Sequence, residues 1–323
     1  MTALCFRGIA ATAVLSAVLA ACGSGGSSAG GSSTGTPIAT AVATAVATPV
    51  ATPGRYSKVM LVMEENETYG KVLSGGAAPY LASLAQRFGV VQNLQAGYPV
   101  SCPSLPSYLI LSSGSDHGVC DDAGPQAHQL GGDNLFAEVR ASGRQWRVYA
   151  EAMPAVCDHS NSGNYLVRHT MAPYYTDLAG DCPNWDLPLG TAESGVFHDD
   201  VTGGQLPALS LVVPDDCDDM HGGSGCPTDL VRAGDDWLHR TLGAVTAGPD
   251  WTAGRLAILI AWDEGSDTDN HVPGLVLSPT TSQVTLTEPL TNCALLRLMS
   301  DVLTVAPLRC AQQAPAIRGE LGL

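Results

Sequence analysis

The sequence predicts an α/β fold in which a central, mostly parallel sheet is flanked by helices. Two observations predict it. Five short apolar segments are candidate strands: residues 58–63, 147–150, 209–213, 256–260 and 275–277. Each of them runs straight into polar residues of the kinds used in catalysis. Because ligands bind outside the carboxyl ends of the strands in an open α/β sheet, these polar residues would converge on one site.

The N-terminus predicts export. Residues 1–21 carry one Arg, an apolar run from 8 to 20 and small residues at the end, a pattern typical of a secretion signal that is too short to span a bilayer. The run closes as Leu-Ala-Ala-Cys, which resembles a bacterial lipobox, so we expect a diacylglyceryl group on Cys22 and an anchor in the outer face of the cell membrane. Simple secretion after cleavage near Ala21 is the alternative.

The rest of the chain divides into a tether and one domain. Residues 22–54 are rich in Gly and Ser and then in Ala, Thr, Pro and Val, which predicts a lipidated linker. Residues 55–323 are long enough for one large α/β domain. The formal charge of −16 excludes a nucleic-acid backbone as a partner, and bound cations would offset part of it.

Eight cysteines remain when Cys5 and Cys22 are set aside. They are Cys102, Cys120, Cys157, Cys182, Cys217, Cys226, Cys293 and Cys310. An even number in an exported chain predicts disulfides. Sequential pairing would close four short loops, but eight cysteines allow 105 pairings, so the connectivity stays open.

Ser104 is a candidate nucleophile. Residues 101–111 predict a loop that turns into a helix, with Pro106 in the first turn and Ser104 at or just before the N-terminus. A hydroxyl there would face unpaired backbone N–H groups and the positive end of the helix dipole, which favour phosphate and an ionised oxygen. The alternative is that Ser104 only caps the helix.

Two clusters of oxygen ligands predict a metal site. Glu65 and Asn66 follow one strand, and Asp263 and Glu264 follow another, so both clusters occupy equivalent positions in the sheet. Such oxygens suit a divalent cation that lowers the pKa of a bound hydroxyl and neutralises phosphate. Because side chains alternate along a strand, a turn is needed to aim Glu65 and Asn66 together.

The segment 215–221 holds four carboxylates and one imidazole but lacks the spacing of an EF-hand loop. In it, His221 is a candidate ligand or acid, against the alternative of a merely exposed histidine. His169 and His271 are weaker candidates.

With these residues in place, the chain resembles the bacterial phosphoesterase family of secreted acid phosphatases and phosphatidylcholine-cleaving phospholipases C, within the alkaline phosphatase superfamily. The matching segments are residues 63–66, 103–108, 149–154, 165–169, 218–221, 234–238 and 262–264. The resemblance implies an alkaline-phosphatase-like sandwich with Ser104 as the nucleophile. It also implies further roles for matching residues: Glu65, Asn66, Asp263, Glu264 and Asp219 at the metal, His221 and His169 in catalysis, and Glu151 and Ser107 at the substrate.

Two departures from the family pattern affect this interpretation. Ser107 stands where the family usually has an Asn that touches a phosphate oxygen. Asn292 stands where the family has a His suited to a second metal, so we expect one divalent ion rather than two.

The leading prediction is an exported, metal-dependent phosphomonoesterase of the acid phosphatase type that acts on phosphoinositides or other phosphate esters. A phospholipase C or another phosphodiesterase would use the same machinery. A sulfatase is disfavoured because Tyr108 stands where its motif needs Arg. A non-catalytic surface-binding lipoprotein is the alternative from another class.

The lipobox predicts that Cys22 carries the membrane anchor. We expect radiolabelled palmitate to enter the wild-type protein and not the Cys22→Ala variant, because the thiol is the attachment point. Gel autoradiography after expression in a bacterial host measures the label. Equal labelling of both proteins would show that Cys22 does not carry the lipid anchor.

Overall fold

The computed structural model describes residues 56–97 and 101–323. The expected signal sequence, Cys22 and the tether lie outside the described residues and stay predictions. Within the described part, none of the helices has both the length and the apolar character needed to cross a membrane.

The domain is built on a mixed sheet of eight strands in the order β10-β2-β9-β7-β1-β6-β4-β5. Its strands are β1 (Lys58–Glu64), β2 (Gly89–Val91), β4 (Trp146–Ala150), β5 (Asp186–Pro188), β6 (Leu209–Val213), β7 (Leu256–Trp262), β9 (Gly274–Leu277) and β10 (Val284–Leu286). All neighbours pair in parallel except β9, which is antiparallel to β2 and β7. A smaller sheet joins β11 (Leu290–Thr291), β3 (Leu94–Gln95) and β8 (His271–Val272). The predicted α/β class is confirmed.

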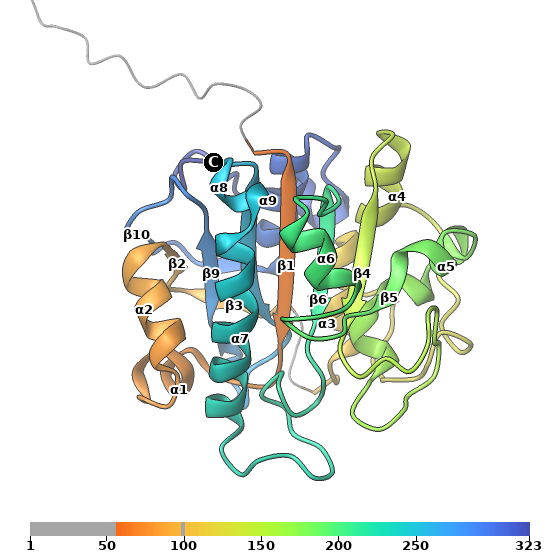
Figure 1. Ribbon diagram of the computed structural model, residues 1–323, viewed down its shortest axis with the longest axis horizontal. Helices are drawn as coiled ribbons and strands as arrows, with labels where there is room; N and C mark the ends of the chain where they lie inside the picture. The colour runs from red at the N-terminus through yellow and green to blue at the C-terminus, as the bar shows by residue number, and fades with distance from the viewer. Residues whose placement is uncertain (1–55, 98–100) are drawn as a thin grey trace, which may run out of the picture. The chain divides into compact units, whose positions relative to one another are not determined.

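Helices cover both faces of the large sheet, and α6 and α7 lie in front of it in Figure 1. The α-helices are α1 (Tyr69–Ser74), α2 (Pro79–Arg87), α3 (Leu105–Ser113), α4 (Leu135–Ala141), α5 (Cys182–Trp185), α6 (Val196–Thr202), α7 (Leu230–Ala247), α8 (Pro249–Thr252) and α9 (Asn292–Leu303). Short 3₁₀ helices are η1 (Val167–Thr170), η2 (Ala172–Tyr174), η3 (Thr176–Leu178) and η4 (Arg309–Gln312).

The register of the strands decides which face each residue joins. Lys58 of β1 forms an ion pair with Asp250 of α8, 2.7 Å away, so the even-numbered residues of β1 face α8. Leu61 lines the opposite face together with residues of α3, α4 and α9. Because side chains alternate along a strand, Glu64 and the next residue in the chain leave the end of β1 on opposite faces.

The sequence predicts that the polar residue after the apolar segment 275–277, which is Ser278, joins the site, and this prediction is wrong. Ser278 follows β9, and β9 runs antiparallel to β7, so its carboxyl end lies at the edge of the sheet away from the end of β1. There the buried Ser278 hydroxyl lies 2.8 Å from the Thr281 hydroxyl within a turn. An apolar run gives no information about strand direction, which depends on long-range pairing.

The cysteines form the sequential pairs. Disulfides join Cys102 to Cys120, Cys157 to Cys182, Cys217 to Cys226, and Cys293 to Cys310. The first joins the loop before α3 to the loop after it, and the third lies in the loop after β6. Each bridge restricts a loop in the unfolded chain and so favours the folded state.

This pairing predicts that denatured, unreduced protein has no reactive thiol in residues 55–323. Thiol titration with Ellman's reagent before and after reduction measures the number directly, with a Cys5→Ala, Cys22→Ala variant as the matched control. Two free thiols per chain in that control would contradict the pairing.

Candidate active site

Glu65 is the centre of a buried cluster at the carboxyl end of β1. Its side chain is fully buried and accepts hydrogen bonds from three groups. Ser104 Oγ donates to Oε2 at 3.1 Å, Tyr108 Oη to Oε1 at 2.6 Å, and Asn66 Nδ2 to Oε2 at 3.1 Å. A buried carboxylate without such donors would be very costly, so the donors make this charge tolerable.

Two histidines complete the surroundings of Glu65. Nδ1 of the half-buried His221 lies 3.0 Å from Oε2, and Nε2 of the buried His169 lies 3.1 Å from Oε1. His169 also stacks on the ring of Tyr108, with centroids 5.0 Å apart. Burial opposes ionisation of Glu65, but the two histidines and the tyrosine outweigh it and lower its pKa to about 2.

The backbone explains why these groups meet. The Glu65 N–H donates to the carbonyl of Asp219 at 2.8 Å, which ties the end of β1 to the loop after β6. Asn66 has a φ of 50°, and its N–H donates to Asp263 Oδ1 at 3.2 Å. This left-handed residue supplies the turn that the sequence requires, and Asn is one of the residue types that adopt it readily.

Three further carboxyl groups crowd the same edge. Burial raises the pKa of both Asp219 and Asp263, and the charge of Glu65 raises it further in each case. Burial and Glu65 likewise raise the pKa of Glu264 to about 7. Asp219 Oδ2 and Asp263 Oδ2 are buried with no hydrogen-bond partner among the described residues. Unpaired hard oxygens beside other carboxylates are the donor set that a divalent cation prefers.

A second group of candidate ligands shares Glu65. Ligand atoms of Glu65, His169 and His221 all lie within 4.8 Å of one another. Burial lowers the pKa of His169 to about 4, with the charge of Glu65 opposing, so its imidazole is neutral and able to bind a metal. Nitrogen and oxygen ligands are therefore both available around Glu65, and His169 Nδ1 lies 3.5 Å from Asp219 Oδ2.

Ser104 precedes α3 but does not cap it. Its hydroxyl points to Glu65, and the described N–H groups of the first turn make no hydrogen bond to it. The Leu105 N–H donates to Asp122 Oδ1 at 3.0 Å, Pro106 has no N–H, and the Ser107 N–H donates to the Ser104 carbonyl. Residues 105–107 therefore offer no free amide at this helix end, because each N–H already has a partner or is missing.

Comparison with known proteins identifies the family of the chain. The model of the Phosphoesterase family matches residues 56–293. The chain belongs to the Phosphoesterase family. This phosphoesterase is 25% identical over 267 residues to a Mycobacterium tuberculosis protein named phosphatidylinositol-3-phosphatase, covering 81% of this chain and 82% of that protein. It is therefore a phosphoric ester hydrolase.

Solved structures resemble the phosphoesterase in fold. A member of the alkaline phosphatase superfamily from Vibrio parahaemolyticus is 12% identical with a TM-score of 0.56, covering 83% of this chain and 72% of that one. The lipoteichoic acid synthase LtaP from Listeria monocytogenes is 8% identical with a TM-score of 0.53, covering 80% and 76%. The family resemblance and the alkaline-phosphatase-like fold are thus confirmed.

Sequence reasoning missed three residues of the phosphoesterase site. Tyr108 binds Glu65, and Asp122 caps α3. Arg168 Nε lies 3.2 Å from Asp122 Oδ2. The hydrogen bond to Glu65 raises the pKa of His221, and burial and the Arg168 charge oppose this shift. Arg168 directly precedes His169 in a segment that matches the family, which was the available signal.

Other predicted residues lie apart from the Glu65 cluster or only beside it. Glu151 directly follows β4 and lies level with Glu64 across the sheet, so its side chain leaves the face opposite to that of Glu65. It accepts a hydrogen bond from the Asp215 N–H at 3.1 Å. We therefore leave Glu151 out of the site. Ser107 is buried as the third residue of α3, and His271 stacks on Tyr69.

The crowded carboxylates predict opposite effects on stability and metal binding. We expect Asp263→Asn to raise the melting temperature of the metal-free phosphoesterase, since it removes a buried charge that Glu65 and Glu264 repel. The same variant should lose bound metal. Calorimetry on chelator-treated protein measures the melting temperature, and elemental analysis of purified protein measures the bound metal. Full metal occupancy in the variant would show that the ion binds elsewhere.

Proposed function

We propose that this enzyme is an exported, metal-dependent phosphomonoesterase that uses Ser104 as its nucleophile. The observation that carries the proposal is the direction of the Ser104 hydroxyl, which points to the buried Glu65 instead of capping α3. The relative named phosphatidylinositol-3-phosphatase supports phosphoinositides as a substrate class, with other phosphate monoesters as alternatives.

Residues at the ends of two strands would hold the metal. Glu65, Asn66, Asp263 and Glu264, with Asp219 beside them, offer the oxygens, and the unpaired Oδ2 atoms of Asp219 and Asp263 fit this role. When bound, the ion lowers the pKa of the serine hydroxyl and neutralises phosphate charge. One ion is preferred, because Asn292 offers no imidazole for a second.

The protonation of the two histidines distinguishes their roles. A hydrogen bond to Glu65 raises the pKa of His221, although burial opposes it, so Glu65 favours the protonated imidazole that a general acid needs. Burial lowers the pKa of His169, so this imidazole stays neutral and orients Glu65 and Tyr108. His221 is therefore the proposed general acid.

The proposed reaction has two steps. The ionised Ser104 Oγ attacks phosphorus, a bond to Oγ forms, the ester P–O bond breaks, and His221 gives its proton to the departing oxygen. Water next attacks the phosphoserine, its proton passes to His221, and the bond to Oγ breaks to release phosphate. Both Ser104 and His221 end in their starting protonation states. Arg168, whose Nε lies 3.2 Å from Asp122 Oδ2, and Ser107 are the residues proposed to bind phosphate oxygens.

The proposal predicts that Ser104→Ala abolishes turnover. We expect kcat/KM for p-nitrophenyl phosphate to fall by about 10³ or more, since the covalent route is lost. Stability should change by about 1–3 kcal/mol, the cost of one hydrogen bond to a buried charge. Steady-state assays and thermal melts measure both effects.

Two controls accompany this experiment. Ser101→Ala removes an exposed hydroxyl from the same loop and should keep full activity. Chelation of wild-type enzyme should stop hydrolysis, and a divalent ion should restore it. A diester substrate tests the phosphodiesterase alternative. Normal turnover by Ser104→Ala would overturn the mechanism.

A further inference from the structure

The loop after β6 holds His221 between two bonded cysteines. A disulfide joins Cys217 to Cys226, which are 9 residues apart in sequence, and we call residues 217–226 the disulfide loop. His221 lies inside it, with Nδ1 3.0 Å from Glu65 Oε2. In Figure 1 the chain between β6 and α7 projects beyond the end of the sheet at which β1 ends. The disulfide loop therefore carries the proposed general acid to the Glu65 cluster.

The backbone turns sharply on both sides of His221. Met220 has a φ of 78° and Gly222 has a φ of 96°. A left-handed φ at a residue other than glycine costs free energy and persists only where the surrounding structure enforces it. A Cβ atom added to Gly222 would lie 2.6 Å from Leu230 Cδ1, so this turn is also tightly packed. The conformation around His221 therefore needs a constraint from outside the turn.

The half of the disulfide loop after His221 is a poor constraint by itself. Residues 223–225 are exposed and consist of Gly and Ser, which lose much conformational freedom when they are ordered. The Gly223 N–H donates to Cys226 Sγ at 3.0 Å, and the Cys226 N–H donates to the Gly223 carbonyl at 3.4 Å. Both bonds lie within the loop. The disulfide, together with a 2.6 Å bond from the Gly222 N–H to the Asp216 carbonyl, ties this half to the half before His221.

The half before His221 is fixed to the rest of the domain. Asn164 Nδ2 donates to Cys217 Sγ at 3.2 Å, and the Asp216 N–H donates to the Asn164 carbonyl at 3.0 Å. The Cys217 N–H donates to Asp215 Oδ1 at 2.9 Å. The disulfide therefore links the mobile type of sequence at Cys226 to an anchored residue, and His221 lies between the two.

We propose that the Cys217–Cys226 disulfide is a positioning element that keeps His221 within reach of the departing ester oxygen. This inference rests on the proposed role of His221 as the general acid. A proton donor acts only within hydrogen-bond distance of the atom that it protonates. Without the disulfide, the loop has more conformations, and fewer of them hold His221 at that distance. Hydrolysis should then slow most for esters that need the proton.

Two substrates distinguish the loss of a proton donor from general damage. p-Nitrophenyl phosphate releases a stabilised anion that needs little protonation, whereas 2-phenylethyl phosphate would release a strongly basic alkoxide and needs the acid. The ratio kcat/KM reports the steps up to the first P–O cleavage, in which the acid acts. General damage to the site lowers kcat/KM for both esters, and a misplaced acid lowers it mainly for the alkyl ester.

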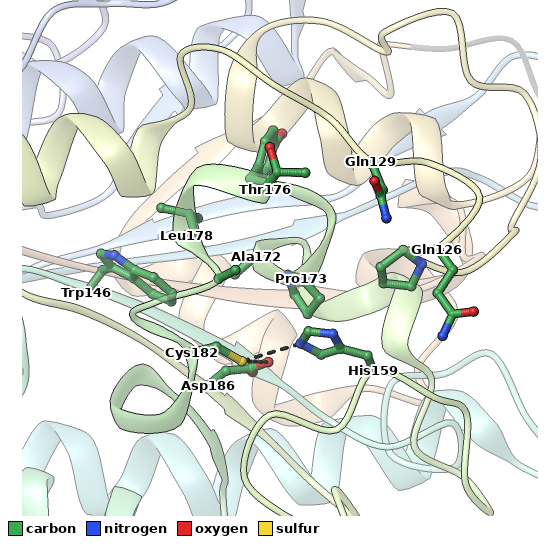
Figure 2. A pocket seen from close by; sticks show the side chains of 13 residues that line it. Gln126, Gln129, Trp146, His159, Ala172, Pro173, Thr176, Leu178, Cys182 and Asp186 are labelled. Atoms are coloured by element: carbon green, nitrogen blue, oxygen red, sulfur yellow. Dashed lines mark hydrogen bonds between the residues drawn. The ribbon is translucent and has the colours of Figure 1, made fainter.

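The test variant is Cys217→Ser with Cys226→Ser. We expect kcat/KM for 2-phenylethyl phosphate to fall by about tenfold or more and kcat/KM for p-nitrophenyl phosphate to fall by less than about threefold. The matched control is Cys157→Ser with Cys182→Ser. Cys182 lines a cavity of about 230 Å³ that contains no residue of the Glu65 cluster (Figure 2). This control should leave the ratio between the two esters unchanged.

His221→Asn is the reference for a missing acid. It should show the same preference for p-nitrophenyl phosphate, with a loss of about 10² for the alkyl ester. An equal loss for both esters in His221→Asn would overturn the acid role and this inference with it. Selectivity in His221→Asn without selectivity in the Cys217, Cys226 variant would overturn this inference alone. Equal selectivity in the Cys157, Cys182 control would also overturn it.

Thermal melts check that the variants fold. If the Cys217, Cys226 variant does not, folded wild-type enzyme is treated with dithiothreitol, because both cysteines are partly exposed. The dithiol gives two electrons and two protons to the disulfide, which becomes two thiols, and is itself oxidised to a cyclic disulfide. Alkylation and peptide mass mapping identify the opened bond, and activity is measured after the reagents are removed and divalent ion is restored. An unchanged ratio between the esters in enzyme opened at Cys217–Cys226 would overturn the proposal.

Discussion

The buried charge of Glu65 is the constraint on which this site depends. An ionised carboxylate at the end of β1 is tolerable only if donors surround it, and those donors come from α3, η1 and the loop after β6. The fold therefore brings Ser104, Tyr108 and both histidines to the two carboxylate oxygens of Glu65. The contacts that make Glu65 stable also orient Ser104 and His221, the proposed nucleophile and the proposed acid.

The same edge of the sheet carries an excess of negative charge that the protein part alone does not balance. Burial and then the charge of Glu65 raise the pKa values of Asp219, Asp263 and Glu264, which share this small space. Parallel strands and short disulfide-closed loops hold these groups together in spite of their repulsion. In the proposed function, this arrangement sacrifices stability of the metal-free protein for affinity toward a cation.

Strand alternation divides the molecule's polar groups into separate environments. Glu64 and Glu65 are neighbours in sequence, yet Glu64 is fully buried on the opposite face and has no hydrogen-bond partner among the described residues. Burial raises the pKa of Glu64, so it is held neutral, whereas Glu65 is ionised. One residue step along a strand thus decides whether a carboxyl group serves the site or lies inert within the other layer.

The sequence by itself determined the α/β class, the edge of the sheet that holds the site, and the oxidised state expected of the cysteines. Apolar runs, the polar residues after them and the count of cysteines are local signals. Only the tertiary structure decided that β9 runs antiparallel, that Glu151 lies across the sheet from Glu65, and that Arg168 and Asp122 meet beside α3. Strand direction, register and side-chain contact depend on residues far apart in the chain, and the period of a single segment carries no record of them.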